Sequence, residues 1–267
     1  MPLFQLILLA VIQGITEFLP ISSSGHLILL PQLTSMADQG QTIDVAVHVG
    51  TLGAVIVYFW SDVKQALLGV PRLLTGRLDT PGARLAFLLI VATIPAILVG
   101  LVLKVTGLAD AMRSALLIGI TMLGFGIVLW WADQKSPAER EAREWNLREA
   151  WVLGLWQAVA LIPGTSRSGI TITGARFMGY ARPDAAKISM LMSVPVIIAS
   201  GLLLGADVVM SGDAIVAKDA AIGAGFAFVS AMLALVLMMR LLRTVSFMPY
   251  VIYRVVLGAG LIIWSLN

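Results

Sequence analysis

The chain has 267 residues, of which 59% are apolar and only 12% are charged. Soluble domains carry about 25% charged residues, so this composition argues against an ordinary soluble protein and indicates an integral membrane protein. The formal charge of +3 does not indicate nucleic-acid binding, because the basic residues lie in short segments between apolar runs. The absence of cysteine excludes disulfides, thiolate nucleophiles and cysteine-ligated metals.

Six apolar stretches approach the length of roughly 20 residues that crosses a bilayer as a helix. They cover residues 43–60, 84–103, 114–131, 187–206, 220–239 and 248–266. Two further apolar regions, 3–33 and 150–180, are interrupted by Pro, Gly and hydroxyl residues. Their pieces are too short to span, so each region is predicted to form a re-entrant helix–loop–helix hairpin, and the second hairpin ends in a short helix over 168–180.

The basic residues orient these elements. They gather around Lys64–Arg84, in the loop 132–149 and at Arg240–Arg243. The positive-inside rule therefore makes these three connections cytoplasmic, and both termini are predicted to lie outside. The first hairpin then enters from outside, and the second enters from the cytoplasm.

Two polar segments within the apolar regions resemble each other. A shift of 144 positions superposes four identical pairs: Gln13 with Gln157, Ser22 with Ser166, Ser24 with Ser168 and Gly25 with Gly169. We predict one all-α polytopic membrane domain, 1–267, built as an inverted-topology repeat of about 1–135 and 145–267. Each half contains one re-entrant hairpin and three transmembrane helices. The alternative is eight ordinary spans without symmetry.

The first segment carries an acid and an imidazole. Gln13 and Glu17 are four residues apart and share a helix face. The serines Ser22, Ser23 and Ser24 precede a short helix, and His26 lies on the same side of that helix. One serine is accounted for as an N-cap, whereas three hydroxyls at a helix N-terminus favour an anion site.

The second segment carries a guanidinium in place of these groups. Arg167 lies between Ser166 and Ser168 at the start of a short helix, and its planar donors suit a phosphate. Thr165 is a further hydroxyl candidate. The structural alternative is a salt bridge between Arg167 and Glu17 that joins the two halves. The residues alone therefore predict a membrane-embedded site for a phosphate-like anion.

At these residues the chain resembles the undecaprenyl-diphosphate phosphatase family, also called the bacitracin resistance protein family. The resemblance rests on Gln13-Gly-Ile-Thr-Glu-Phe-Leu-Pro-Ile-Ser-Ser-Ser-Gly-His26 and on Pro163-Gly-Thr-Ser-Arg-Ser-Gly169. Ser246-Phe-Met-Pro249 and Ile252-Tyr-Arg254 also resemble the family's C-terminal segment. Some family members have Glu where this chain has Gln13, which leaves Glu17 as the carboxylate candidate on this helix.

The resemblance implies hydrolysis of undecaprenyl diphosphate to undecaprenyl phosphate and inorganic phosphate. This step recycles the lipid carrier for peptidoglycan and confers bacitracin resistance at high levels. The family also implies the bacterial cytoplasmic (inner) membrane, an active site open to the periplasm, and a divalent cation, Mg²⁺ or Ca²⁺, near Gln13 and Glu17. Whether the protein forms a homodimer is not determined by the sequence.

A mechanism follows as a hypothesis. Arg167 holds the diphosphate with the hydroxyls of Ser22, Ser24, Thr165, Ser166 and Ser168. Ser23 or a water attacks the terminal phosphorus. His26 is the acid–base residue, oriented or charged by Glu17, and the carbonyl of Gln13 positions the metal or the water.

Three other functions are compatible with part of this pattern. An inverted repeat is also typical of a lipid flippase or secondary transporter. Ser24-Gly-His26 resembles part of the acid-phosphatase-like lipid phosphatases, but Thr173 occupies the position of their last histidine. An intramembrane serine protease would leave Arg167 without a role.

Overall fold

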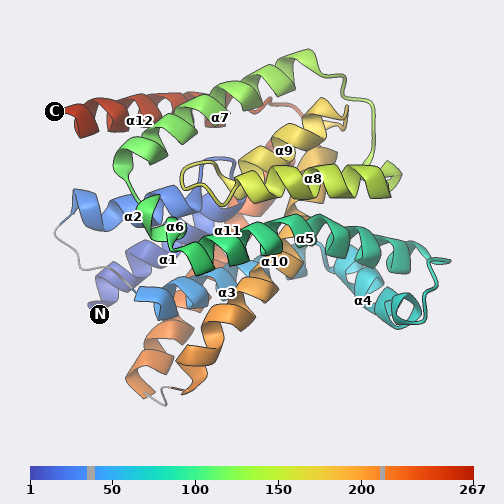
Figure 1. Cartoon of the computed structure of the whole chain (residues 1–267), viewed down its shortest axis with the longest axis horizontal. Helices are drawn as coiled ribbons and strands as arrows, with labels where there is room; N and C mark the ends of the chain where they lie inside the picture. Colours follow the sequence, from blue (N-terminus) through green and yellow to red (C-terminus); the bar gives the residue numbers. More distant parts are fainter. Residues whose placement is uncertain (35–39, 211–213) are drawn as a thin grey trace.

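The computed structural model describes residues 1–34, 40–210 and 214–267, and these residues are helical apart from turns and short connections. In chain order the helices are α1 (Leu3–Phe18), α2 (Ser23–Leu33), α3 (Gly40–Tyr58), α4 (Trp60–Leu74), α5 (Pro81–Thr106), α6 (Leu108–Ala111), α7 (Ala115–Lys135), the 3-10 turn η1 (Ala142–Glu144), α8 (Leu147–Val159), α9 (Arg167–Phe177), α10 (Arg182–Met210), α11 (Ala214–Leu241) and α12 (Met248–Leu266). Figure 1 shows α8 between α5 and α9, and the pair α7 and α12 along one edge.

Five helical segments are long and apolar enough to cross a membrane: Pro81–Thr106, Ala115–Lys135, Arg182–Leu202, Val216–Leu241 and Met248–Leu266. They coincide with five of the six predicted spans. Many of their leucines and valines point outward, for example Leu98, Leu101, Leu233 and Val256. An apolar outer surface is what a lipid solvent requires, so the chain is a multi-pass membrane protein.

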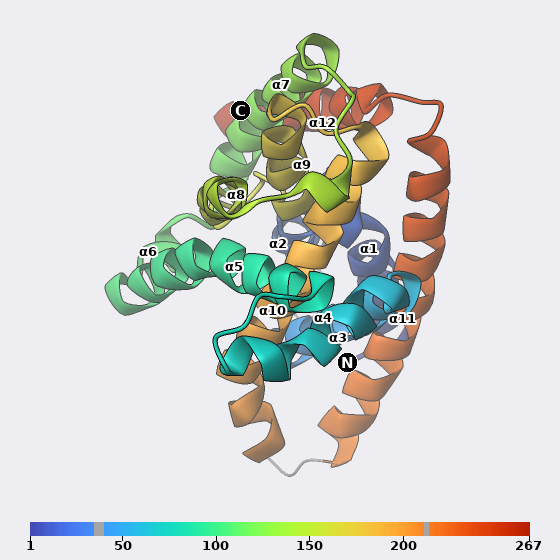
Figure 2. The ribbon, with the colours of Figure 1, turned by 90° about the vertical axis from the view of Figure 1, so that its right-hand side faces the viewer.

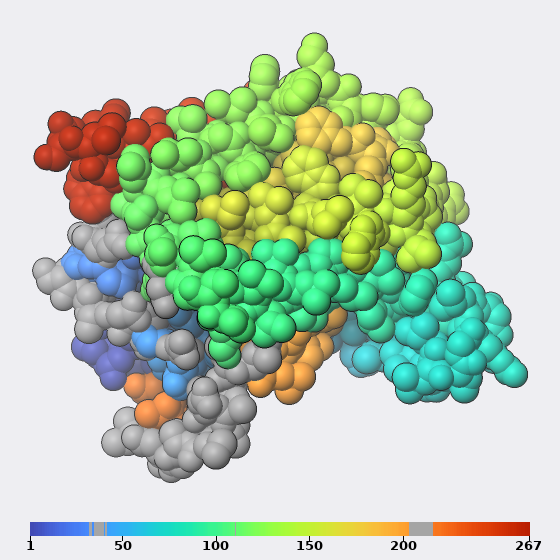
Figure 3. Space-filling model, in the orientation of Figure 1, coloured from blue at the N-terminus to red at the C-terminus, as the bar shows by residue number. Residues whose placement is uncertain are grey.

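The remaining predicted span differs in form. Helix α3 is long and apolar enough to cross a membrane only when it is taken together with α4. The two helix axes are bent by 94° from each other. From the sequence, the segment 61–84 with its basic residues was expected to be a loop. This expectation was wrong for most of the segment, because Trp60–Leu74 is helical. Val63, Ala66 and Gly69 recur every three residues and are buried, whereas Lys64 and Arg72 are exposed, so the segment folds as an amphipathic helix. In Figure 3, α4 projects from one side of the molecule.

Both predicted hairpins are helices with a break in the middle. Helices α1 and α2 are separated by residues 19–22, and α8 and α9 by residues 160–166. These four helices have 16, 11, 13 and 11 residues, which is shorter than the roughly 20 that span a bilayer. Helix α1 packs on α11, and α8 packs on α5. Figure 2 shows the long helix α11 along one side of the bundle.

A buried cluster of charges ties four helices together at one end. Asp133 near the end of α7 accepts hydrogen bonds from Arg176 at 3.2 Å and Arg182 at 2.7 Å. Its second oxygen accepts from the backbone N–H of Phe247, which precedes α12. Since the carboxylate is 1% exposed, its charge is balanced within the protein. The cluster fixes the ends of α7, α9, α10 and α12 relative to one another.

Candidate active site

The two loops share an unusual backbone conformation. Among the residues that the structure describes, only Ser22 and Ser166 combine a side chain with positive φ, of 75° and 72°. Each is the N-cap of the following helix, and its Oγ accepts from the N–H of the glycine three residues later. Left-handed backbone at a serine is strained, so the loops are held by their surroundings. The sequence match between the segments therefore corresponds to a match in local structure.

A buried arginine of α12 holds both loops. Arg254 donates to the carbonyl oxygens of Pro20 in the first loop and Gly164 and Thr165 in the second. It also donates to Thr121 and Met122 of α7. The sequence analysis named Arg254 only as part of a segment that resembles the family, because its contacts come from three distant places in the chain.

The two hairpins meet at an ion pair. Arg167 donates to Glu17 Oε1 at 2.9 Å, and its second terminal nitrogen donates to the carbonyl oxygen of Ser189 at 3.0 Å. A second link joins the loops nearby, where Ser168 Oγ donates to the carbonyl oxygen of Leu19 at 2.9 Å. The salt bridge was one of the two sequence-based interpretations of Arg167. It brings together the acid of one hairpin and the guanidinium of the other.

Three more side chains lie close to the second carboxylate oxygen of Glu17. Oε2 accepts from Gln13 Nε2 at 2.8 Å and from Ser23 Oγ at 2.8 Å. The Nε2 atom of His48 lies 3.7 Å from the same oxygen. Glu17 is 7% exposed, so its charge is balanced by Arg167 and by these hydrogen bonds rather than by solvent.

His48 on α3 is a site residue that the sequence interpretation missed. The same 144-residue shift that marked Glu17 and Arg167 places His48 opposite Met192. That mismatch of an imidazole with an apolar residue was available as a signal. It was overlooked because α3 reads as an ordinary apolar span outside the two matched segments.

His26 has different surroundings from those predicted. Its Nδ1 is 2.6 Å from the carbonyl oxygen of Ser22, and its Nε2 is 2.5 Å from the hydroxyl of Tyr253 on α12. The prediction that Glu17 orients His26 is therefore wrong. Ser23 at the start of α2 does contact Glu17, whereas His26, one turn later, contacts Tyr253 of α12.

A cavity of about 430 Å³ opens at the ion pair. Its polar lining comprises Glu17, Ser23, Ser24, Asp44, His48, Arg113, Gln157, Ser166, Arg167 and Ser200. The predicted phosphate contacts Ser24, Ser166 and Arg167 are thus at the cavity wall. Ser22, Thr165 and Ser168 are not part of the lining: Ser22 caps α2, Ser168 bonds Leu19, and Thr165 is fully buried.

Gln13 and Glu17 do not form a preformed cation site. The Gln13 amide donates to Glu17, and its carbonyl oxygen is buried without a partner and does not reach the cavity. Arg167 already places a positive charge beside Glu17. Within the described part of the chain, no three His, Asp or Glu side chains cluster as metal ligands. The donor set therefore does not fit a resident divalent ion.

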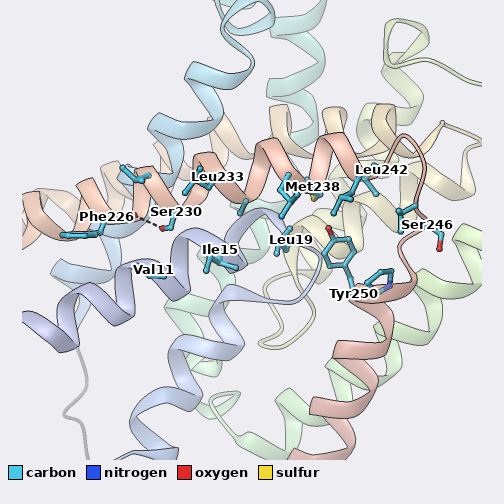
Figure 4. A pocket seen from close by; sticks show the side chains of 16 residues that line it. Val11, Ile15, Leu19, Phe226, Ser230, Leu233, Met238, Leu242, Ser246 and Tyr250 are labelled. Atoms are coloured by element: carbon cyan, nitrogen blue, oxygen red, sulfur yellow. Dashed lines mark hydrogen bonds between the residues drawn. The ribbon is translucent and has the colours of Figure 1, made fainter.

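The opposite face of α1 has a different character. Val11, Ile15 and Leu19 line an apolar groove of about 660 Å³ between α1, α11 and the start of α12. Figure 4 shows these side chains facing Leu233 and Met238 of α11, with Tyr250 at one end. The groove has no charged group in its lining, so the chemistry of the site belongs to the cavity at Glu17 and Arg167.

Comparison with known proteins agrees with these motifs. The model of the family described as bacitracin resistance protein BacA matches residues 6–260. A protein of Ruegeria pomeroyi named undecaprenyl-diphosphatase is 71% identical over 98% of both chains. Proteins of the same name from Dinoroseobacter shibae and Hahella chejuensis are 68% and 45% identical, with 97–98% of each chain covered. This chain belongs to the bacitracin resistance protein BacA family.

Proposed function

We propose that this chain is an undecaprenyl-diphosphate phosphatase, which hydrolyses undecaprenyl diphosphate to undecaprenyl phosphate and inorganic phosphate. The names of its near-full-length relatives support this activity. The observation that carries it is the meeting of Arg167, Glu17 and Ser23 at one cavity in a membrane protein. The product is the lipid carrier that peptidoglycan synthesis reuses, which connects the reaction to bacitracin resistance.

Arg167 is the proposed phosphate-binding group. A guanidinium has five N–H donors, and the bonds to Glu17 and Ser189 use two of them. The other donors can bind phosphate oxygens, and the hydroxyls of Ser24 and Ser166 add contacts at the same wall. Positive charge at these oxygens stabilises the transition state of phosphoryl transfer.

Ser23 or a water is the proposed nucleophile. The Ser23 hydroxyl donates to Glu17 at 2.8 Å, which orients its oxygen lone pairs away from the carboxylate and leaves them available for attack. A bond forms from this oxygen to the terminal phosphorus as the bridging P–O bond breaks, and undecaprenyl phosphate leaves with the electron pair. If Ser23 attacks, water then hydrolyses the phosphoserine. His26 is assigned a supporting role, since it binds the Ser22 carbonyl and Tyr253.

A divalent cation is proposed as a companion of the substrate rather than a resident of the protein. Mg²⁺ is commonly bound through substrate phosphates and one or two carboxylates, with waters completing its shell. Such an ion would reduce the charge of the diphosphate as it enters the cavity. We expect EDTA to lower turnover and to leave the melting temperature of the substrate-free protein unchanged.

We also propose the inverted repeat, with halves of about 1–135 and 145–267. The packing of helices supports it, because α1 on α11 has its counterpart in α8 on α5 when the halves are exchanged. The pairs α7 with α12 and α3 with α10 map onto themselves. In this arrangement the hairpins enter from opposite faces, both termini lie outside, and the cavity opens to the periplasm of the inner membrane. Both halves of the site belong to one chain, so the reaction does not require a homodimer.

The test is release of inorganic phosphate from undecaprenyl diphosphate by detergent-purified protein. Arg167→Ala and Glu17→Ala should each lower turnover by roughly 10²-fold or more, as loss of a preorganised electrostatic group does. His26→Ala should also lower turnover, because the imidazole is hydrogen-bonded to the carbonyl oxygen of Ser22 and thereby holds the turn before α2. Arg243→Ala, at an exposed arginine, is the control and should match the unmodified protein. Transport without phosphate release, seen only in sealed vesicles, would instead support a flippase.

A further inference from the structure

His48 is a titratable side chain in the cavity that the proposed mechanism has not used. It is one of two histidines in the chain and lies on α3, outside both sequence motifs. Its side chain is 35% exposed and belongs to the cavity lining with Glu17, Ser23 and Arg167. This imidazole and the hydroxyl of Ser23 lie beside the same oxygen, Glu17 Oε2, at 3.7 Å and 2.8 Å.

The hydrogen bonds of His48 fix which nitrogen carries the proton. Its Nδ1 lies 2.6 Å from the carbonyl oxygen of Asp44, one turn earlier on α3. A carbonyl oxygen only accepts, so Nδ1 is the protonated nitrogen. The lone pair of a neutral His48 is then on Nε2, the atom 3.7 Å from Glu17 Oε2. This is the tautomer that a general base needs.

The other candidates for proton transfer are already engaged. Glu17 accepts hydrogen bonds from Gln13, Ser23 and Arg167, and these favour its ionised form. An ion-paired carboxylate is a weak base. His26 has both ring nitrogens bonded, to Ser22 and Tyr253, and is absent from the cavity lining.

We propose that His48 is the acid–base residue of the reaction, a proposal that rests on the phosphatase function above. As the oxygen of Ser23 or water bonds to phosphorus, its proton passes to His48 Nε2. In Ser23 this proton is hydrogen-bonded to Glu17 Oε2, the oxygen that lies 3.7 Å from His48 Nε2. The bridging P–O bond breaks, and undecaprenyl phosphate leaves as an anion that needs no proton. Glu17 stabilises the resulting imidazolium across the 3.7 Å gap to the newly protonated Nε2, because opposite charges at this distance attract.

The charges around His48 are mixed. Glu17 faces it from α1, Arg167 from the start of α9 and Arg113 from the residues before α7, and Asp44 lies on its own helix. Within the described residues, α10 lines the cavity with Val196, Ile197, Ser200 and Gly201, none of which titrates, and α4 and α11 contribute nothing to this wall. A pH dependence that disappears on replacement of His48 is therefore attributable to this imidazole or to its coupling with Glu17.

The experiment compares His48→Gln with His26→Gln in detergent, with kcat and KM measured against pH. His48→Gln should lower kcat by about 10²-fold, keep KM within about threefold, and lose the acidic limb of the kcat profile. The acidic limb of the kcat profile should persist in His26→Gln, even if the absolute value of kcat is lower. His48→Ala should regain activity with added imidazole, which the cavity of about 430 Å³ can admit.

The outcomes separate the two proposals. If the unmodified protein releases no phosphate, the function is wrong. If it does, and His48→Gln keeps the acidic limb or imidazole fails to rescue a folded His48→Ala, the role of His48 is wrong. A limb that vanishes only in His26→Gln would return that role to His26.

Discussion

Arg254 is a fully buried guanidinium whose described hydrogen bonds all go to backbone carbonyl oxygens. Removing it would leave carbonyl oxygens of both loops without a donor, and each such buried group costs about 1–3 kcal/mol. We therefore expect Arg254→Met to destabilise the protein by roughly 2–4 kcal/mol and to reduce turnover, because both loops carry site residues. Thermal unfolding in detergent measures the first effect. Arg243→Met, at an exposed position, is the control, and equal melting temperatures for the two variants would contradict the role of Arg254.

A second residue-scale prediction concerns Glu149, which precedes the second hairpin. It accepts hydrogen bonds from Arg140 and Tyr180. Burial raises the pKa of Glu149, but these hydrogen bonds and the charge of Arg140 outweigh burial and hold the pKa below its ordinary value of about 4.5. A lowered folded pKa means that the stabilisation is complete above the unfolded-state value and is lost as the pH falls through the folded value.

Glu149→Gln should therefore lower the melting temperature at pH 7, by the equivalent of about 1–2 kcal/mol. The difference in melting temperature between Glu149→Gln and the unmodified protein should become smaller below about pH 4.5. Melting curves from pH 7 to pH 3 measure this, with Glu139→Gln at an exposed position as the control. A difference in melting temperature that stays constant from pH 7 to pH 3 would contradict the stabilising role of ionised Glu149.

At the scale of elements, close helix packing limits the side chains at the contacts. A Cβ atom added to Gly50 of α3 would lie 2.2 Å from the carbonyl oxygen of Ala224 on α11. Gly225, the next residue on α11, has open space around its missing Cβ. The two glycines thus form a matched pair at one helix contact.

Gly50→Ala should destabilise the protein by about 1–3 kcal/mol, because α3 and α11 must separate to admit the methyl group. Gly225→Ala should be neutral or stabilising by up to about 1 kcal/mol, since alanine favours a helix over glycine. Thermal unfolding compares them. Equal effects of the two substitutions would show that this contact is not tight.

The elements were largely predictable. Length and hydropathy located the five long apolar helices, helix α3 and the breaks near Pro20 and Pro163. Lipid requires continuous apolar helices, and a break needs Pro, Gly and polar residues. Helix α4 was not predicted. Its buried residues recur every third position, but Leu67 and Leu68 are apolar and exposed, so only contact with α5 shows which face is buried.

At the scale of the whole molecule, the proposed inverted topology is open to a direct test. The chain has no cysteine, so single cysteines can be introduced without background. Asn267→Cys should react with a membrane-impermeant thiol reagent in intact cells stripped of their outer membrane. Glu139→Cys and Thr75→Cys should react only after the membrane is opened, because their loops are predicted to be cytoplasmic. Labelling of Asn267→Cys and Glu139→Cys from the same side would contradict the topology.

The sequence by itself determined the class of protein, the long helices and the two broken hairpins, and it singled out Glu17 and Arg167 as buried charges. These features depend on composition and local pattern, because lipid makes every buried charge expensive and therefore conspicuous. Only the tertiary structure decided which groups meet. It placed His48 beside Glu17, turned His26 toward Tyr253 and set Arg254 between the two loops. Such contacts join residues up to 234 positions apart, and their geometry depends on how whole helices pack rather than on any local spacing.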